Sequence, residues 1–195
     1  MTTIIIPTET PTATVGHRAP GRLNMPDWGA AGWAGLISGT LFMLCELVLL
    51  PYSKGGNAWV PVRMVAAVVF GRETLPTPPY FAQAAAPSSG AFFMAVALHY
   101  SLAIIFARIL STMIYRVDRR TALTAGAFFG LILYAVNFYA ATAAFPWFAA
   151  ARGWASLLSN VVFGASAALL YKAFETREPL MEDEPEPYER LPRRY

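Results

Sequence analysis

Five polar side chains lie inside or beside long apolar stretches of this sequence and could carry out chemistry there: Glu46, Arg63, His99, Asn137 and Asn160. An ionisable group in an apolar medium is costly unless it is paired, so a carboxyl or an imidazole in such a place is a functional candidate by default. If these side chains gather, they predict a small polar cavity that binds a proton, an ion, a quinone head or another ligand.

The same residues also have a purely structural interpretation. Glu46 could be neutral or paired with Arg63, and His99 could hydrogen-bond to Asn137 or to a backbone carbonyl, which would pin the segment around Arg63 onto its neighbours. One histidine and one glutamate supply only two protein ligands, so no metal site is expected. Haem held by two histidines is not expected within one chain either, because the other histidine, His17, lies near the N-terminus.

Sequence signatures of common catalytic sites are missing. The sequence contains no phosphate-binding glycine loop, no HExxH, no CxxC and no GxSxG. His99 and Ser101 do not form a catalytic pair, because residues two apart on a helix point to different sides. We therefore expect no enzymatic activity and no cofactor, apart from a bound lipid or quinone.

Long apolar helices must position these residues. Of the 195 residues 56% are hydrophobic and only 14% are charged, whereas a soluble domain carries about a quarter charged residues. Crossing about 30 Å of hydrocarbon takes roughly 20 apolar helical residues. Four stretches reach or approach that length: 29–50, 91–114, 121–145 and 154–171. The expected fold class is an all-α, four-helix transmembrane bundle.

A fifth apolar stretch, 58–70, is too short to cross, and Gly-rich and Pro-rich segments flank it. It predicts an interfacial or re-entrant helix between the first two spans. The chain therefore divides into an N-terminal tail (1–28), a membrane domain (29–174) and a C-terminal tail rich in acidic and basic residues (175–195).

Basic residues indicate the orientation of the helices. With the N-terminus inside, ten Lys and Arg lie on the inner side of the membrane and four on the outer side. Cytoplasmic segments carry the excess of basic residues, so both termini are predicted to be cytoplasmic. Glu46, His99, Asn137 and Asn160 then all fall in the outer half of the membrane. Because the basic residues flank apolar runs and form no stripe, nucleic acid is not an expected partner.

Glycines at a spacing of four give two of the spans a smooth ridge: Gly35 with Gly39, and Gly126 with Gly130. Membrane helices approach closely through such small residues. Glu46 and Asn137 each follow the second glycine of a ridge by seven residues, which is close to two helical turns. Both polar groups are therefore predicted to face protein and not lipid.

Four further residues are candidates for contacts with a partner: Arg108, Trp147, Arg152 and Trp154. Arg108 follows His99 by nine residues, about two and a half turns, and so lies on the opposite face of its helix, towards headgroups or a neighbouring subunit. The other three belong to FPWFAAARGW, which connects the last two spans and predicts either a turn lying flat at the headgroups or a docking surface.

The segments GGNAWVPVRMVAAVVFG, HYSLAIIFARI and NFYAATAAFPWFAAARGW resemble those of a bacterial family of small four-helix inner-membrane proteins of unknown function. Members of that family often carry the names of sodium-coupled transporters, which this chain is too small to resemble in fold. The resemblance covers roughly residues 29–174 and implies the four-helix architecture, but it supplies no activity, cofactor or site residue.

These observations leave three functions open. The first expectation is a non-catalytic accessory subunit of a larger bacterial inner-membrane complex, of a respiratory or other electron-transfer kind, with lipid and other membrane subunits as partners. The second is a small transporter or channel with a polar cavity on the periplasmic side. The third is a quinone- or lipid-binding membrane module.

Overall fold

The computed structural model describes residues 25–75 and 84–175, and all regular elements there are helices. Four helical segments are long and apolar enough to cross a membrane: α1 (Trp28–Lys54), α3 (Ser89–Ile114), α4 (Arg119–Ala135) with its continuation to Ala143, and α5 (Trp154–Phe174). The shorter apolar helix α2 (Trp59–Phe70) lies between the first two. The predicted four-helix transmembrane bundle is confirmed, and nearly all of both predicted tails lies outside the described residues.

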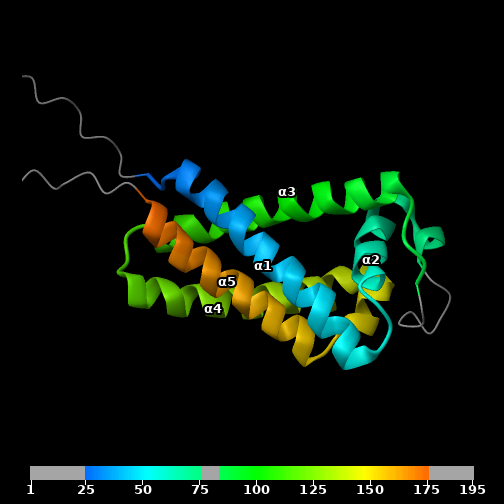
Figure 1. Ribbon diagram of the computed structural model, residues 1–195. Coiled ribbons are helices and arrows are strands. Elements are labelled where there is room, and N and C mark those ends of the chain that lie inside the picture. The colour runs from blue at the N-terminus through cyan, green and yellow to red at the C-terminus, as the bar shows by residue number, and fades with distance from the viewer. Residues whose placement is uncertain (1–24, 76–83, 176–195) are drawn as a thin grey trace, which may run out of the picture.

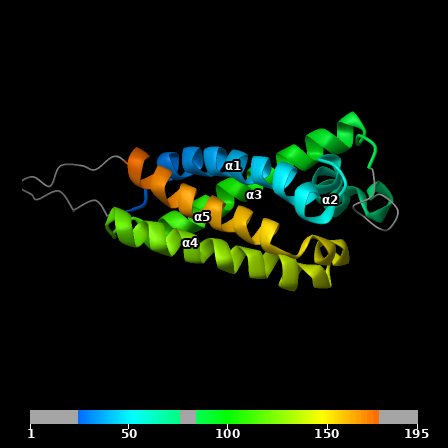
Figure 2. The ribbon, with the colours of Figure 1, turned by 60° about the horizontal axis from the view of Figure 1, so that its bottom comes forward.

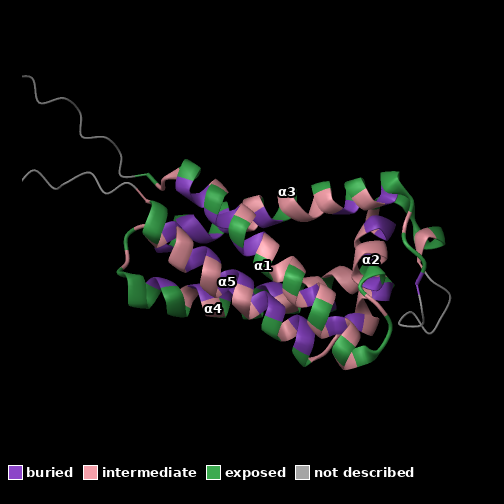
Figure 3. Ribbon diagram, viewed as in Figure 1, coloured by how far each residue is buried: buried purple, intermediate pink, exposed green. Residues whose placement is uncertain are grey.

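Helix α5 packs along both α4 and α1, whereas α3 packs on α1 and α2 and has little contact with α4 (Figures 1 and 2). The main core contains mostly small residues from the four long helices, among them Ala34, Ala107 and Ala168. Figure 3 shows that buried residues lie on the faces that meet inside the bundle, while exposed residues lie on the outer faces. Outward apolar residues suit a protein whose solvent is lipid.

The closest helix contact joins α4 to α5. Gly126 and Gly130 on α4 lie directly against the backbone of α5, and a Cβ atom built at Gly126 would lie 2.6 Å from the Cβ of Ala168. Gly164 on α5 completes this contact, because a Cβ there would lie 2.8 Å from the backbone nitrogen of Gly130. The second predicted ridge is thus used within the chain, against a glycine that sequence analysis did not select.

The first ridge brings α1 against α3. A Cβ built at Gly35 would lie 2.8 Å from the Cα of Ile104, and one at Gly39 would lie 2.7 Å from the Cβ of Ala103. Beyond Gly39 the next turn of α1 carries the large side chain of Phe42, and the two helices diverge towards the end where α2 lies (Figure 1). This divergence opens space inside the bundle.

Helix α2 lies crosswise at that end of the bundle (Figure 1). Gly55 and Gly71 flank it with φ angles of 80° and 86°, which other residues rarely adopt, so the chain can turn sharply at both ends. Its buried residues Val60 and Met64 face the α4–α5 connection, and Ala66 faces α3. The short apolar helix predicted between the first two spans is confirmed, and whether it is interfacial or re-entrant stays a prediction.

Two spans differ in detail from their predicted form. Helix α1 continues to Lys54 through Pro51, because a proline near the end of a helix costs only one backbone hydrogen bond. The third predicted span, 121–145, is not one regular helix. After Ala135 the chain forms a π-helical segment, Val136–Ala140, followed by a 3₁₀ turn, Ala141–Ala143.

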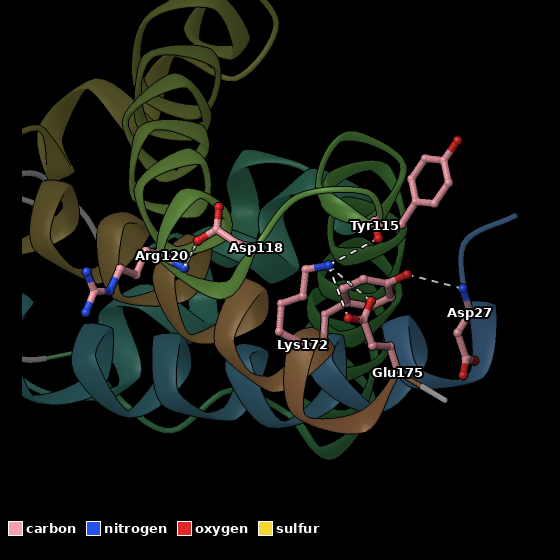
Figure 4. Close-up of polar contacts among 7 residues, drawn as sticks. Asp27, Tyr115, Asp118, Arg120, Lys172 and Glu175 are labelled. Atoms are coloured by element: carbon pink, nitrogen blue, oxygen red, sulfur yellow. Dashed lines mark hydrogen bonds and ion pairs between the residues drawn. The ribbon is translucent and has the colours of Figure 1, made fainter. Parts of the chain in front are cut away.

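Polar contacts fasten the end of the bundle opposite α2 (Figure 4). Lys172 near the end of α5 donates a hydrogen bond to the carbonyl oxygen of Tyr115 at 3.2 Å and pairs with Glu175 at 3.2 Å. The hydroxyl of Tyr171 accepts a hydrogen bond of 3.2 Å from the backbone nitrogen of Asp27. These contacts join the start of α1, the end of α5 and the α3–α4 connection.

Asp118 caps the start of α4 within this connection. Its carboxylate accepts hydrogen bonds from the backbone nitrogens of Arg120 and Thr121, at 2.9 and 3.2 Å, and from the Thr121 hydroxyl. These bonds favour the charged carboxylate, so the pKa of Asp118 lies below its ordinary value, with the Thr121 hydroxyl as the largest cause. The cap provides partners for backbone donors that the first turn of a helix leaves unpaired.

Candidate functional site

A cavity of about 670 Å³ lies where α3 diverges from α1, and α2 closes its end. All four long helical segments and α2 contribute to its wall. The cavity is partly enclosed and partly open to the outside. Its volume lies within the range of roughly 300 to 1,000 Å³ that is usual for small-molecule sites. The space is thus large enough for a drug-sized molecule or part of a lipid.

Most of the wall of this cavity is apolar. Eight lining residues are Phe or Trp, among them Phe42 on α1, Phe106 on α3 and Phe163 on α5. The polar residues of the wall are Glu46, His99, Asn137 and Asn160. The structure therefore brings four of the five predicted polar residues to one cavity, but it makes that cavity mainly hydrophobic.

Three of these polar residues belong to one chain of hydrogen bonds, which we call the polar strip: Asn137, Asn160, Ser156 and Glu46. The amide of Asn137 donates to Oδ1 of Asn160 at 3.4 Å, and the Asn160 amide donates to the carbonyl oxygen of Ser156 at 2.7 Å. The Ser156 hydroxyl then donates to Oε2 of Glu46 at 3.3 Å. The strip joins the π-helical segment, α5 and α1.

Sequence analysis did not select Ser156, although a signal existed. It precedes Asn160 by four residues and so lies on the same face of α5. Asn137 sits in the π-helical segment Val136–Ala140. Such segments insert one extra residue into a helical turn and occur frequently at functional sites.

Glu46 is the most deeply buried ionisable residue of the cavity wall, with 7% of its surface exposed. Its Oε1 atom has no hydrogen-bond partner among the described residues. Its Oε2 atom shares the single hydroxyl proton of Ser156 with the carbonyl oxygen of Ala151, which lies 3.0 Å from that hydroxyl. The protein itself therefore satisfies this carboxyl group poorly.

Arg63 does not pair with Glu46, so of the two structural alternatives for Glu46, neutral or paired, the ion pair is wrong. Its guanidinium donates to the carbonyl oxygens of Thr74 and Ala85, both at 2.7 Å, and to that of Ala86 at 3.2 Å. These bonds hold the segment that precedes α3 against α2. Arg63 is thus a structural residue of the α2 region and does not line the cavity.

His99 lines the cavity and fastens α3 to α1. Its Nε2 atom lies 2.9 Å from the carbonyl oxygen of Gly39, and because a carbonyl can only accept, Nε2 carries the proton. The ring also stacks on Phe42, with 5.7 Å between the centroids. The predicted bond to a backbone carbonyl is confirmed, whereas the alternative bond to Asn137 is not made.

Trp147 lies inside the protein and not on a docking surface. It is 6% exposed, and its indole nitrogen donates to the carbonyl oxygen of Met64 on α2 at 3.0 Å. Trp154, seven residues later, is 53% exposed, and Arg108 is exposed on the outer face of α3. Of the three residues predicted in this connection, Trp154 alone offers a largely exposed side chain.

Arg152 is also partly buried and bonds to the end of the third span. It donates to the carbonyl oxygen of Phe138 in the π-helical segment and to the Thr142 hydroxyl, the latter at 2.9 Å. Its guanidinium lies 4.4 Å from the centroid of the Tyr139 ring. Arg152 therefore stabilises the irregular segment that carries Asn137, a role that its predicted place at the headgroups did not indicate.

Fold and cavity define a multi-pass helical membrane protein with a mainly apolar cavity among its helices. Comparison of the chain with protein-family models, with curated proteins and with solved structures finds no match. The resemblance to a family of small four-helix proteins stays a prediction. The function has to be argued from the cavity itself.

Proposed function

We propose that this chain is a non-catalytic membrane module that binds an amphiphilic molecule in the cavity beneath α2. The observation that carries this proposal is an apolar space of about 670 Å³ with the polar strip on one wall. A ligand with a bulky apolar body and a small polar head matches both features. Lipids and quinones belong to this class, which was the third expectation from the sequence.

The composition of the wall favours a binding site over an ion pathway. Ions cross membranes along rings of polar groups or backbone carbonyls, or through water-filled pores. Here aromatic and aliphatic side chains surround the space, and four polar residues lie among them. The apolar part of a ligand makes dispersion contacts with such a wall. The wall atoms lack these contacts when the cavity is empty.

The accessory-subunit role stays a prediction. One motive for it was the pair of glycine ridges, which could have received helices of other subunits. Gly126 and Gly130 instead face α5, and Gly35 and Gly39 face α3. Both ridges are occupied within the chain, so they add no support for a partner.

Filling the cavity is expected to abolish ligand retention. Val96 on α3 is half-buried and lines the cavity, so Val96→Trp would place an indole in the space of the ligand. After extraction in mild detergent, native mass spectrometry should find a small molecule on the wild type and roughly a tenth as much on Val96→Trp. Ile109→Trp is the matched control, because Ile109 lies on the same helix with 46% exposure and does not line the cavity. Equal retention in all three proteins would contradict the proposal.

We further propose that the protein lies in a bacterial inner membrane with both termini in the cytoplasm. The positive charge of the α3–α4 connection supports this orientation. In a Cys45→Ala background, Glu73→Cys should react with a membrane-impermeant maleimide in intact spheroplasts, and Arg116→Cys should react only after permeabilisation. Both parent residues are exposed. The reverse labelling pattern would refute the proposed orientation.

A further inference from the structure

The Glu46 carboxyl group has no counter-charge in the cavity wall, and only its Oε2 atom receives a hydrogen bond, from Ser156. Oε1 is buried without a partner, and no Lys or Arg lies among the residues that line the cavity. Arg63 is engaged with three backbone carbonyls elsewhere. A buried carboxyl group without a partner is stable as the neutral acid, and it carries its charge only when something compensates that charge. Within the described residues, the protein leaves that compensation to whatever enters the cavity.

The cavity wall that Glu46 shares is rich in aromatic rings. Phe42 lies one helical turn before Glu46 on the same face of α1, and its ring contacts that of Phe163 on α5 at 6.3 Å between centroids. Phe138 and Phe148 form a second ring contact in the wall, at 6.2 Å. Aromatic faces attract organic cations through the negative charge of their π systems, and most strongly where water is excluded.

We propose that the ligand of the cavity is a bulky organic cation, of the quaternary ammonium or phosphonium type, whose charge pairs with Glu46 while its apolar groups lie against the aromatic walls. This inference rests on the proposed function and specifies the ligand class. A cationic ligand accounts for three features at once: the unpartnered Oε1 atom, the lack of a basic side chain in the wall, and the aromatic lining. A neutral amphiphile does not account for all three.

His99 does not supply the missing charge in this arrangement. Its Nε2 atom is held by the carbonyl oxygen of Gly39, and Gly39 precedes Glu46 by seven residues, about 10 Å along the axis of α1. Phe42, which lies between Gly39 and Glu46 on α1, helps to line the cavity there. The cation would therefore meet the carboxyl group of Glu46 about two helical turns along α1 from the carbonyl oxygen that holds His99.

The test compares a cation with a neutral molecule of similar shape. Methyltriphenylphosphonium and triphenylphosphine oxide would be titrated against the full-length protein in lipid nanodiscs, with empty nanodiscs subtracted. Glu46→Gln removes one partner of a buried charge pair. The variant should therefore bind the cation roughly 30-fold or more weakly than the wild type does. Binding of the neutral oxide should change less than about threefold, because glutamine keeps the shape of the side chain and can still accept the bond from Ser156.

Glu46→Asp provides a second check, since it keeps the charge and should retain more of the cation affinity than Glu46→Gln. A cation affinity that Glu46→Gln leaves unchanged would overturn the inference, as would a neutral probe that loses as much affinity as the cation. If only the oxide binds, and Val96→Trp removes it, the inference fails while the proposed function stands. If neither probe binds and Val96→Trp retains as much small molecule as Ile109→Trp, both fail.

Discussion

A single methyl group at Gly164 is expected to separate α4 from α5 and to destabilise the bundle by about 3 kcal/mol or more. In Gly164→Ala the new Cβ would overlap the carbonyl oxygen of Gly126 and lie 2.8 Å from the backbone nitrogen of Gly130. Both atoms belong to the backbone, so no side chain can rotate away to relieve the overlap. The helices must move apart, and the small-residue contacts along their whole interface weaken together.

Two other glycines provide matched controls for this substitution. A Cβ built at Gly32 or at Gly90 meets no atom within 4 Å, so Gly32→Ala and Gly90→Ala should leave the protein as stable as the wild type or slightly more so. Thermal unfolding in mild detergent, followed by size-exclusion chromatography of the remaining monodisperse protein, measures all three. A melting temperature of Gly164→Ala equal to that of Gly32→Ala would show that α4 and α5 do not pack as described.

These glycines illustrate how far the sequence reveals the fold. Small residues four apart indicate that one face of a helix is smooth, and all four predicted glycines indeed face protein. The spacing does not say which helix lies opposite, because any segment with a small residue at the right depth can approach. Gly164 is such a residue, and it lacks the second glycine at a spacing of four that drew attention to the other ridges.

Polar residues in apolar segments were a sound guide to the site, because the cost of leaving them in lipid drives them towards the interior. Their partners were harder to predict. Arg63 bonds to backbone carbonyls, which every residue carries and which leave no mark in a sequence. The cavity itself forms because α1 and α3 diverge beyond Gly39. This divergence is a property of the packed bundle, and no single segment encodes it.

Removing the indole of Trp147 should have the largest effect of any change in the α4–α5 connection. Trp147→Ala is expected to cost about 3–5 kcal/mol of stability, because the ring is 6% exposed and packs against Val60 and Met64 on α2. Trp147→Phe keeps most of the packing but loses the bond to the Met64 carbonyl, so it should cost about 1 kcal/mol for that bond and somewhat more for the smaller ring. Trp154→Ala, at an exposed position, should stay within about 0.5 kcal/mol of the wild type.

The same substitution connects stability to ligand binding. Trp147 joins α2 to the α4–α5 connection, and α2 closes the end of the cavity, so loosening this contact should open the cavity before the long helices separate. In Trp147→Phe, hydrogen exchange of α2 amides should therefore rise and small-molecule retention should fall, while exchange in α4 and α5 stays slow. Uniform exchange across all helices would instead mean that α2 is an inseparable part of the bundle and that its position cannot control access to the site.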